Sequence, residues 1–427
     1  METTVEKLKQ SRIKTTTVVP AEIRKLAEVS ALTELGQGMD IKGFRQGKAP
    51  LELIRERVKP DDLLEYTIRH LLPEIMTGAL KTSGAKPIIR PAANITSRDP
   101  LTIELIFVER PPVTLKKPEK ISVAQNPVTG ATPAEVDEFI RKILVQDRTE
   151  APVDRSAASG DTIRMSLGAK DEKGNPINEL VTSHYNILIG SEDLLPELEP
   201  HLIGMKKDEK KTVTIPFPAD HDITTVRGKK VQVDIAVKEV ASVKLPELTA
   251  EYIKNRLGAE RSPDVFKADV KEMLTSQKKN QEMKRREEEL YEKVRQATSV
   301  ELAPELIETE VRGMVEDLVE RLKQQQTTLE QWLKSTGKNQ KDVLEEMRKI
   351  ATDRITLRFG MQELANAKKI EPTAEEIEAA IKTAEKSGAH AGHHHPEEDS
   401  RPGGALYDEV RWELQMQKLV KEIVGEI

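Results

Sequence analysis

Two glycines, two cations and an aromatic ring lie close together in one short stretch of the chain, at Gly43, Phe44, Arg45, Gly47 and Lys48. The glycines permit tight turns or positive φ angles, so we expect this stretch to be an exposed loop between two helices. The cations place positive charge on the loop. The phenyl ring could stack on a nucleic-acid base or fill a shallow protein pocket.

The charge around this loop differs in sign from that of the whole chain. Residues 41–60 contain six basic and two acidic side chains, a local net charge of +4, whereas the chain has a net charge of −6. The difference indicates a local patch for phosphate groups or for an acidic protein surface. The alternative is a basic loop without a partner, whose Phe44 folds back into its own domain.

Length and composition limit the classes of protein to consider. A chain of 427 residues with 33% charged and 3% aromatic residues is expected to form about two to four domains, elongated and rich in helices. Its net charge argues against a nucleic-acid binder as a whole. The absence of cysteine excludes a disulfide scaffold, thiolate catalysis and Cys-ligated zinc.

Neither end of the chain nor its interior predicts a membrane segment. The first residues, METTVEKLKQSRIK, lack the apolar run of a signal peptide. No stretch approaches the roughly 20 apolar residues that span a bilayer. We therefore expect a cytosolic protein with no membrane partner.

Residues 1–115 are expected to form an α+β domain. Alternation from Ile13 to Val19 predicts a strand, and Leu101–Val108 predicts a second, more buried one.

Three helices are expected between these strands, beginning near Pro20, Pro50 and Pro60, because the first helical turn tolerates proline. Pro73 is expected to bend or end the third helix.

A helical connector over residues 116–150 is expected next. Thr132 and Glu135 have the spacing of a capping box in front of a helix. Residues 149–160 (TEAPVDRSAASG) are rich in small and polar residues, which is typical of a hinge between domains.

Residues 151–243 change to the period of β-strands. Strands are expected at Thr162–Leu167, Tyr185–Ile189, Lys211–Ile215 and Val231–Val240. The segment should form a small antiparallel sheet with one short helix.

Residues 244–427 are expected to be helical. Helices should begin near Pro263, Pro304, Gln340 and Ala405, the first of them about 35 residues long. A flexible insertion is expected at residues 386–404, before the last helix.

Residues 43–50 resemble the ribosome-docking signature of the trigger factor family, G-F-R-x-G-K-x-P, at all six specified positions, the last of which is Pro50. The flanking residues Val19–Ile23 and Ile41-Lys42 are similar too. So are Leu245–Ile253, at the entry into the helical domain, and the arm-helix segment that begins at Pro304. The resemblance covers nearly the whole chain, in the family's order of domains.

The resemblance implies an ATP-independent chaperone without a cofactor, which docks on the large ribosomal subunit and shields nascent and unfolded polypeptides. Its docking residues would be Gly43, Phe44, Arg45, Gly47, Lys48 and Pro50, in contact with a tunnel-exit protein and nearby ribosomal RNA. The family also implies a cytoplasmic, partly ribosome-associated protein that can form a homodimer off the ribosome. It implies a helical C-terminal body with two arms.

The middle domain resembles an FKBP-type prolyl isomerase through Gly160-Asp161-Thr162, Leu202–Lys206 and Phe217-Pro218. Such an enzyme holds a prolyl peptide in an aromatic pocket, which favours the twisted amide of the transition state. The positions carried over to this pocket are Leu167, Tyr185, Leu195, Leu198, Phe217, His221 and Val233. Because most are not aromatic, we expect weak or absent isomerisation. Phe217 could instead belong to the core.

Methionines on the long helices are candidates for a surface that binds varied polypeptides, because the side chain is unbranched and adaptable. They are Met273, Met314, Met347 and Met361, with Met283 and Met416 as further candidates. The alternative is that these side chains pack between helices. Trp332 and Trp412 are expected to be core residues.

Four of the eight histidines lie together at His390, His393, His394 and His395. Clustered imidazoles bind Ni²⁺, Cu²⁺ or Zn²⁺ in vitro. The run lies between glycine and proline with no fixed geometry, so we expect no physiological metal site.

Two other functions compete with the chaperone. One is a stand-alone prolyl isomerase with helical extensions that bind substrate, and the pocket composition speaks against it. The other is a helical adaptor whose basic loop binds a different acidic partner. Pelleting with ribosomes separates the chaperone from both.

Overall fold

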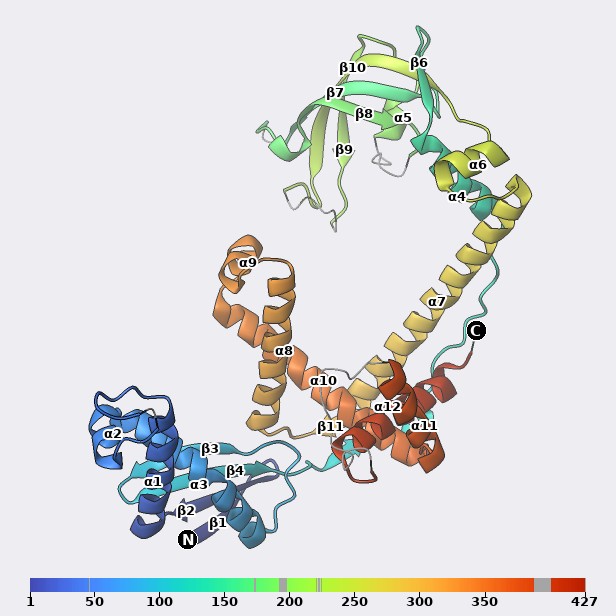
Figure 1. The fold of residues 1–427 in the computed structure, drawn as a ribbon. Helices are drawn as coiled ribbons and strands as arrows, with labels where there is room; N and C mark the ends of the chain where they lie inside the picture. The colour runs from blue at the N-terminus through green and yellow to red at the C-terminus, as the bar shows by residue number, and fades with distance from the viewer. Residues whose placement is uncertain are drawn as a thin grey trace. The chain divides into compact units, whose positions relative to one another are not determined.

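The computed structural model describes residues 1–45, 47–172, 174–191, 198–219, 221, 223, 225–387 and 401–426. The chain divides into two compact units (Figure 1). The first comprises Met1–Asn126 with Met283–Ile427, and the second is Pro127–Glu282.

The N-terminal sheet of the first unit has four antiparallel strands in the order β1-β2-β4-β3. They are β1 (Glu2–Leu8), β2 (Arg12–Val18), β3 (Ala92–Arg98) and β4 (Leu101–Val108). The two central strands, β2 and β4, confirm the alternation in the sequence. The edge strands β1 and β3 were not predicted, because most of their residues are exposed on both faces and show no apolar period.

Three helices accompany this sheet: α1 (Ala21–Gln37), α2 (Leu51–Arg57) and α3 (Pro60–Ser83). They begin at the predicted prolines, with Pro20 and Pro50 as the capping residues of α1 and α2. Apolar residues of α1 and α3 join Phe107 and its neighbours on β4 in one core.

Of the two outcomes expected for Pro73, a bend or an end of the third helix, the end is wrong, since α3 continues to Ser83 with Pro73 inside it. Leu71, Ile75 and Ala79 are exposed by 3%, 1% and 0% and lie on one stripe of the helix. Continuing this buried stripe on both sides of Pro73 outweighs the backbone hydrogen bond that the proline removes.

The N-terminal sheet continues into the helical part of the first unit through several contacts. Strand β5 (Val113–Leu115) pairs with β11 (Thr298–Val300). Val108 at the end of β4 packs in one cluster with Ala303 and Leu306. Arg12 and Glu305 form an ion pair of 3.2 Å.

The connector begins with a short 3-10 helix, Pro118–Lys120, and then lies without regular structure against α7 (Pro263–Ala297), whose Lys293 donates to the Ser122 carbonyl oxygen at 2.8 Å. Ile121 and Val123 join the core of the helical region. The buried Arg286 donates hydrogen bonds to the backbone carbonyl oxygens of Asn126 and Val424, at 2.8 and 3.0 Å. The connector is thus held to the helical core before it leaves the first unit.

The remaining helices of the first unit are α8 (Pro304–Gln324), α9 (Leu329–Thr336), α10 (Gln340–Lys368), α11 (Ala374–Ser387) and α12 (Ala405–Val424). The predicted starts at Pro263, Pro304, Gln340 and Ala405 are confirmed. Helices α9 and α11 were not predicted. Trp412 packs on the core of α7, α10 and α12 as expected. Trp332 does not, because α9 has no buried residue.

The second unit begins with α4 (Pro133–Gln146), whose capping box is confirmed. The Glu135 amide donates to Thr132 Oγ1, and the Thr132 amide donates to Glu135 Oε2 at 2.8 Å. Lys278 donates a further hydrogen bond to this carboxylate, and these bonds lower the pKa of Glu135 to about 2. Helix α6 (Ala250–Leu257) also belongs to this unit.

The sheet of the second unit confirms the four predicted strands as β7 (Thr162–Lys170), β8 (Thr182–Leu188), β9 (Lys210–Pro216) and β10 (Lys230–Lys244). All pairings are antiparallel, with β7 beside β8 and β10 pairing both β7 and β9. The predicted short helix is α5 (Glu199–Leu202).

The expectation of a hinge at residues 149–160 is wrong. Its first residues form β6 (Thr149–Pro152), which pairs with β10. Arg155 Nη2 donates to Asp161 Oδ1 at 2.8 Å, and this guanidinium holds the pKa of Asp161 below its usual value. Sheet pairing and a two-pronged ion pair fix a segment whose small residues had indicated freedom.

Two helical glycines provide a matched test of packing in the first unit. A Cβ at Gly360 on α10 would lie 2.1 Å from Thr298 Oγ1, whereas a Cβ at Gly313 on α8 would meet nothing within 4 Å. We expect Gly360→Ala to lower the free energy of unfolding by about 1–3 kcal/mol through this overlap. Gly313→Ala should raise it by about 1 kcal/mol or less.

Urea unfolding followed by circular dichroism measures both effects in the full chain. A Gly360→Ala variant at least as stable as the unaltered chain would contradict the close packing of α10 on β11.

Candidate functional site

The basic loop identified in the sequence lies between α1 and α2, and apolar side chains fix both of its ends. Ile41 is 4% exposed and packs with Leu32 of α1 and Ile54 of α2. Ala49 and Leu51 pack on the same cluster from the other end of the loop. Sequence reasoning missed this role of Ile41 and Ala49. The sequence pattern that could have predicted this role is an apolar residue on each side of the two glycines.

The two helices that carry the loop are in close contact. A Cβ at Gly36 of α1 would lie 2.5 Å from Cδ1 of Ile54, so the glycine permits α2 to approach. Glu28 of α1 forms ion pairs with Arg55 of α2, at 3.4 Å, and with Arg24, at 2.9 Å. The base of the loop is therefore held by packing and by charge.

Two tight turns shape the loop itself. The Phe44 amide donates to the Ile41 carbonyl oxygen at 3.0 Å, and the Lys48 amide donates to that of Arg45 at 2.9 Å. Gly43 and Gly47 have φ angles of 95° and 76°, as the sequence predicted. Residues that carry a side chain rarely adopt such positive φ angles, so the turns require glycine at these two positions.

The side chains of the loop point to solvent. Phe44 is 43% exposed, and Gly43, Arg45, Gly47, Lys48 and Pro50 are all exposed as well. Within the part of the chain that the structure describes, neither Arg45 nor Lys48 forms an ion pair or a side-chain hydrogen bond. The alternative in which Phe44 folds back into its own domain therefore does not fit. Gln46 lies outside the described residues.

This arrangement offers three different contacts to a partner. A free guanidinium can bind a phosphate or carboxylate through two parallel hydrogen bonds, and an ammonium adds a point charge. The exposed ring can stack or enter a pocket. A fixed base with free cations at its tip suits an anionic surface, either nucleic acid or protein.

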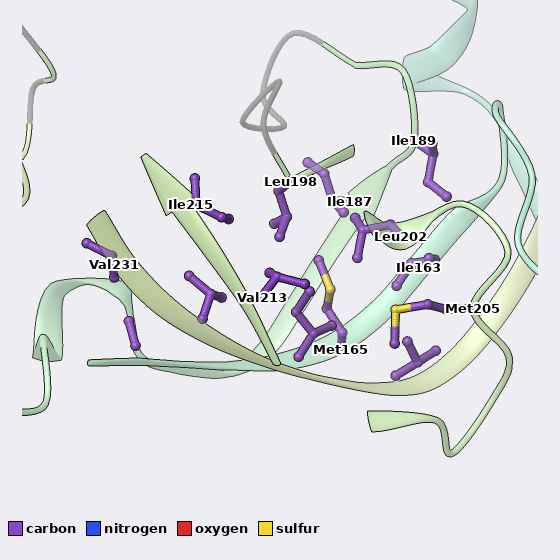
Figure 2. Close-up of a cluster of buried hydrophobic side chains, with 14 of the residues drawn as sticks. Ile163, Met165, Ile187, Ile189, Leu198, Leu202, Met205, Val213, Ile215 and Val231 are labelled. Carbon is purple, nitrogen blue, oxygen red and sulfur yellow. The ribbon is translucent and has the colours of Figure 1, made fainter. Parts of the chain in front are cut away.

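The positions carried over to a prolyl pocket lie mostly in the core of the second unit. Leu198, Phe217 and Val233 are exposed by only 2%, 5% and 5%. Figure 2 shows Leu198 in this core among other apolar side chains of the sheet, such as Met165 and Ile215.

Leu167 and Tyr185 are partly buried against the same core, and Leu195 lies outside the described residues. The apolar positions that the structure describes therefore come together as part of the core of the second unit.

His221 completes this arrangement from the side. Its ring meets that of Phe217 edge-on, with 5.0 Å between ring centroids. Its Nδ1 accepts a hydrogen bond from the Ile223 amide at 3.1 Å. Both contacts give His221 a structural role next to a buried phenyl ring.

The methionines differ in their exposure. Met273 is 37% exposed, and Met314 and Met347 are half-buried. Met361 is only 5% exposed within the helical core, so its expected place on a substrate-binding surface is wrong. Met283 and Met416 pack against that core too. The helix periodicity of the sequence did not tell the two faces of α10 apart.

The structure gives no support for a metal or a membrane segment in the residues it covers. No group of three or more His, Asp or Glu side chains in the described ranges is arranged to hold a metal ion. His390, His393, His394 and His395 lie outside those ranges. None of the described helices is long and apolar enough to cross a bilayer.

Three family models match successive parts of the chain. Residues 1–143 match the model of the bacterial trigger factor protein (TF), and residues 262–424 match the model of its C-terminus. Residues 153–241 match the FKBP-type peptidyl-prolyl cis-trans isomerase model. The two trigger factor models together cover more than half of the chain.

Similar proteins extend over nearly the same length. The trigger factor of Carboxydothermus hydrogenoformans is 28% identical over 389 residues, which cover 89% of this chain and 90% of that protein. The trigger factor of Staphylococcus saprophyticus is 27% identical over 414 residues, which cover 96% and 93%. A solved structure described as "Promiscuous Substrate Recognition in Folding and Assembly Activities of the Trigger Factor Chaperone" covers 100% of both chains, with 22% identity and a TM-score of 0.43.

Because Phe217 is buried, its removal should lower the stability of the second unit. We expect Phe217→Ala to lower the free energy of unfolding of the second unit by about 3–5 kcal/mol, as removal of a core phenyl ring does. His221→Ala, which removes the edge contact and the hydrogen bond from the Ile223 amide, should cost about 1–2 kcal/mol. Urea unfolding of both variants measures the difference. Equal, small effects would mean that Phe217 lines an accessible pocket instead.

Proposed function

The chain belongs to the bacterial trigger factor family, and from this premise we propose that the loop at residues 43–50 is what binds the large ribosomal subunit. The family consists of chaperones with a ribosome-binding N-terminal domain and an FKBP-type domain. The observation that carries the proposal is that Phe44, Arg45 and Lys48 are exposed on a loop whose base is buried. A stand-alone prolyl isomerase is not favoured.

The chemistry of the loop suits both components of the ribosomal surface. Arg45 and Lys48 carry the charge that phosphates of ribosomal RNA attract, and Arg45 can also hold a carboxylate of a tunnel-exit protein. Phe44 supplies an apolar contact at the same tip. We assign Gly43 and Gly47 to the shape of the loop and Pro50 to the start of α2.

The rest of the chain is proposed to act on nascent and unfolded polypeptides. We assign ribosome binding to residues 1–115, the connector to 116–150, the FKBP-like domain to 151–243 and the chaperone body to 244–427. Met273, Met314 and Met347 are the methionines that retain exposed surface for varied substrates. The protein would work in the cytoplasm, partly on ribosomes, and as a homodimer away from them.

The docking loop can be tested with two double variants that remove the same charge from the same domain. Arg45→Ala with Lys48→Ala should reduce cosedimentation with purified large subunits at least about tenfold, because both charge-assisted contacts are lost. Lys7→Ala with Lys9→Ala is the control, since these lysines are exposed in and just after β1. Circular dichroism should show both variants folded. Undiminished pelleting of the first variant would remove the docking role from the loop.

Prolyl isomerisation is proposed to be weak or absent. The described positions carried over to the pocket include Leu198, Phe217 and Val233, which lie in the core and offer little surface to a peptide. With a Phe-Pro peptide, the full chain and residues 150–243 should isomerise at least about tenfold more slowly than FKBP-type domains with an aromatic pocket. Equal rates would contradict this proposal and leave ribosome docking untouched.

A further inference from the structure

The helices of the N-terminal domain leave one strip of its sheet uncovered. Ile95 of β3 lies opposite Ile103 of β4, so the two side chains are on the same face of the sheet. Ile103 is 1% exposed beneath the helices, whereas Ile95 is 46% exposed. The helical layer therefore ends before it reaches the edge strand.

The uncovered strip is the floor of an apolar groove of about 290 Å³ between the N-terminal half of α3 and strand β3. Its apolar lining is made by Leu64 and Ile68 of α3, Ala93 and Ile95 of β3, and Ile103 of β4. Its charged lining residues are Asp61, Glu65 and Arg98. Arg98 and Asp61 form an ion pair of 2.8 Å, but their side chains are 69% and 77% exposed, so the pair adds little stability and is easily opened.

The strand beside the groove is an edge whose first residues lack the charges and prolines that usually protect an edge against further pairing. Strand β3 pairs only with β4, so its outer backbone N–H and C=O groups have no strand partner. The other edge strand, β1, carries charges at Glu2, Glu6 and Lys7, which discourage pairing. Residues 92–97 of β3 (AANITS) carry no charge and no proline. Its bulge lies between Ile95 and Ser97, so Ala92–Ile95 keep a regular register.

We propose that β3 and this groove bind an extended segment of unfolded polypeptide, which adds to the sheet as a fifth strand. Backbone hydrogen bonds to the free edge hold the segment, and its apolar side chains enter the groove. Exposed ion pairs hold the two lining carboxylates, Asp61 with Arg98 at 2.8 Å and Glu65 with Arg69 at 3.4 Å. A Lys or Arg beside the apolar residues of the segment can compete for either carboxylate, because exposed pairs open easily. The inference rests on the proposed chaperone function and gives it a substrate site outside the helical domain.

The absence of cysteine permits a local probe of this site in the full chain. Asn94→Cys on β3, labelled with an environment-sensitive dye, should respond with saturation to an unstructured peptide of alternating Leu and Lys. Thr4→Cys on β1 is the matched control, because both residues are exposed on an edge strand, and its dye should not respond. The same peptide with Glu in place of Lys should bind at least about threefold more weakly. Methylation of alternate backbone nitrogens should weaken binding at least about tenfold, since it removes strand hydrogen bonds.

Two further variants test the groove itself. Ile95→Asp should weaken the response of the Asn94 label at least about tenfold by placing a charge on the apolar floor. Val5→Asp on β1, at a residue that is 41% exposed, should leave it unchanged. Both variants should still pellet with large ribosomal subunits, because neither residue belongs to the docking loop.

The proposed binding to the groove would be wrong if the dyes at positions 94 and 4 responded equally. It would also be wrong if the response at position 94 remained after Ile95→Asp. A response of the Asn94 label to added unlabelled chain, without peptide, would assign the edge to a second copy and also overturn the proposal. Undiminished pelleting of the variant Arg45→Ala with Lys48→Ala would contradict only the proposed role of the docking loop.

Discussion

The small apolar cluster of Leu32, Ile41 and Ile54 is the interaction on which the proposed docking function depends. It joins α1, the base of the loop and α2, while Gly36 lets the two helices approach. Because the base is buried, the exposed ring and cations at the tip are presented without a large ordering cost when a partner binds. A loop of the same sequence without this cluster would lose conformational entropy each time it bound a partner.

In the second unit, the positions carried over to a prolyl pocket pack in the core. Leu198, Phe217 and Val233 are buried among the apolar residues of the sheet, and His221 packs edge-on against Phe217. A core built in this way needs no accessible aromatic cavity to be stable. The FKBP-like domain can therefore contribute to a chaperone as a structured body, independent of the rate at which it isomerises proline.

The first unit has two kinds of surface that suit two kinds of partner. The docking loop offers charges and one ring to an anionic surface. Strand β3, in contrast, offers backbone hydrogen bonds and the apolar side chain of Ile95 on the floor of the groove between α3 and β3. The first surface selects by charge, while the second is suited to an extended chain of varied sequence. Both lie on one small domain, where the loop is held by the cluster of Leu32, Ile41 and Ile54 and the sheet packs on the separate core around Phe107.

The sequence by itself determined those features that depend on local chemistry. Alternation predicted β2 and β4, prolines marked the helix starts, and two glycines predicted the positive φ angles of the loop. Features that depend on distant contacts were decided only by the tertiary structure. Pro73 stays inside α3 because of the packing around it, and edge strands have no buried face to show a period. Burial of Met361 and exposure of Ile95 follow from how far neighbouring elements extend, which no local pattern records.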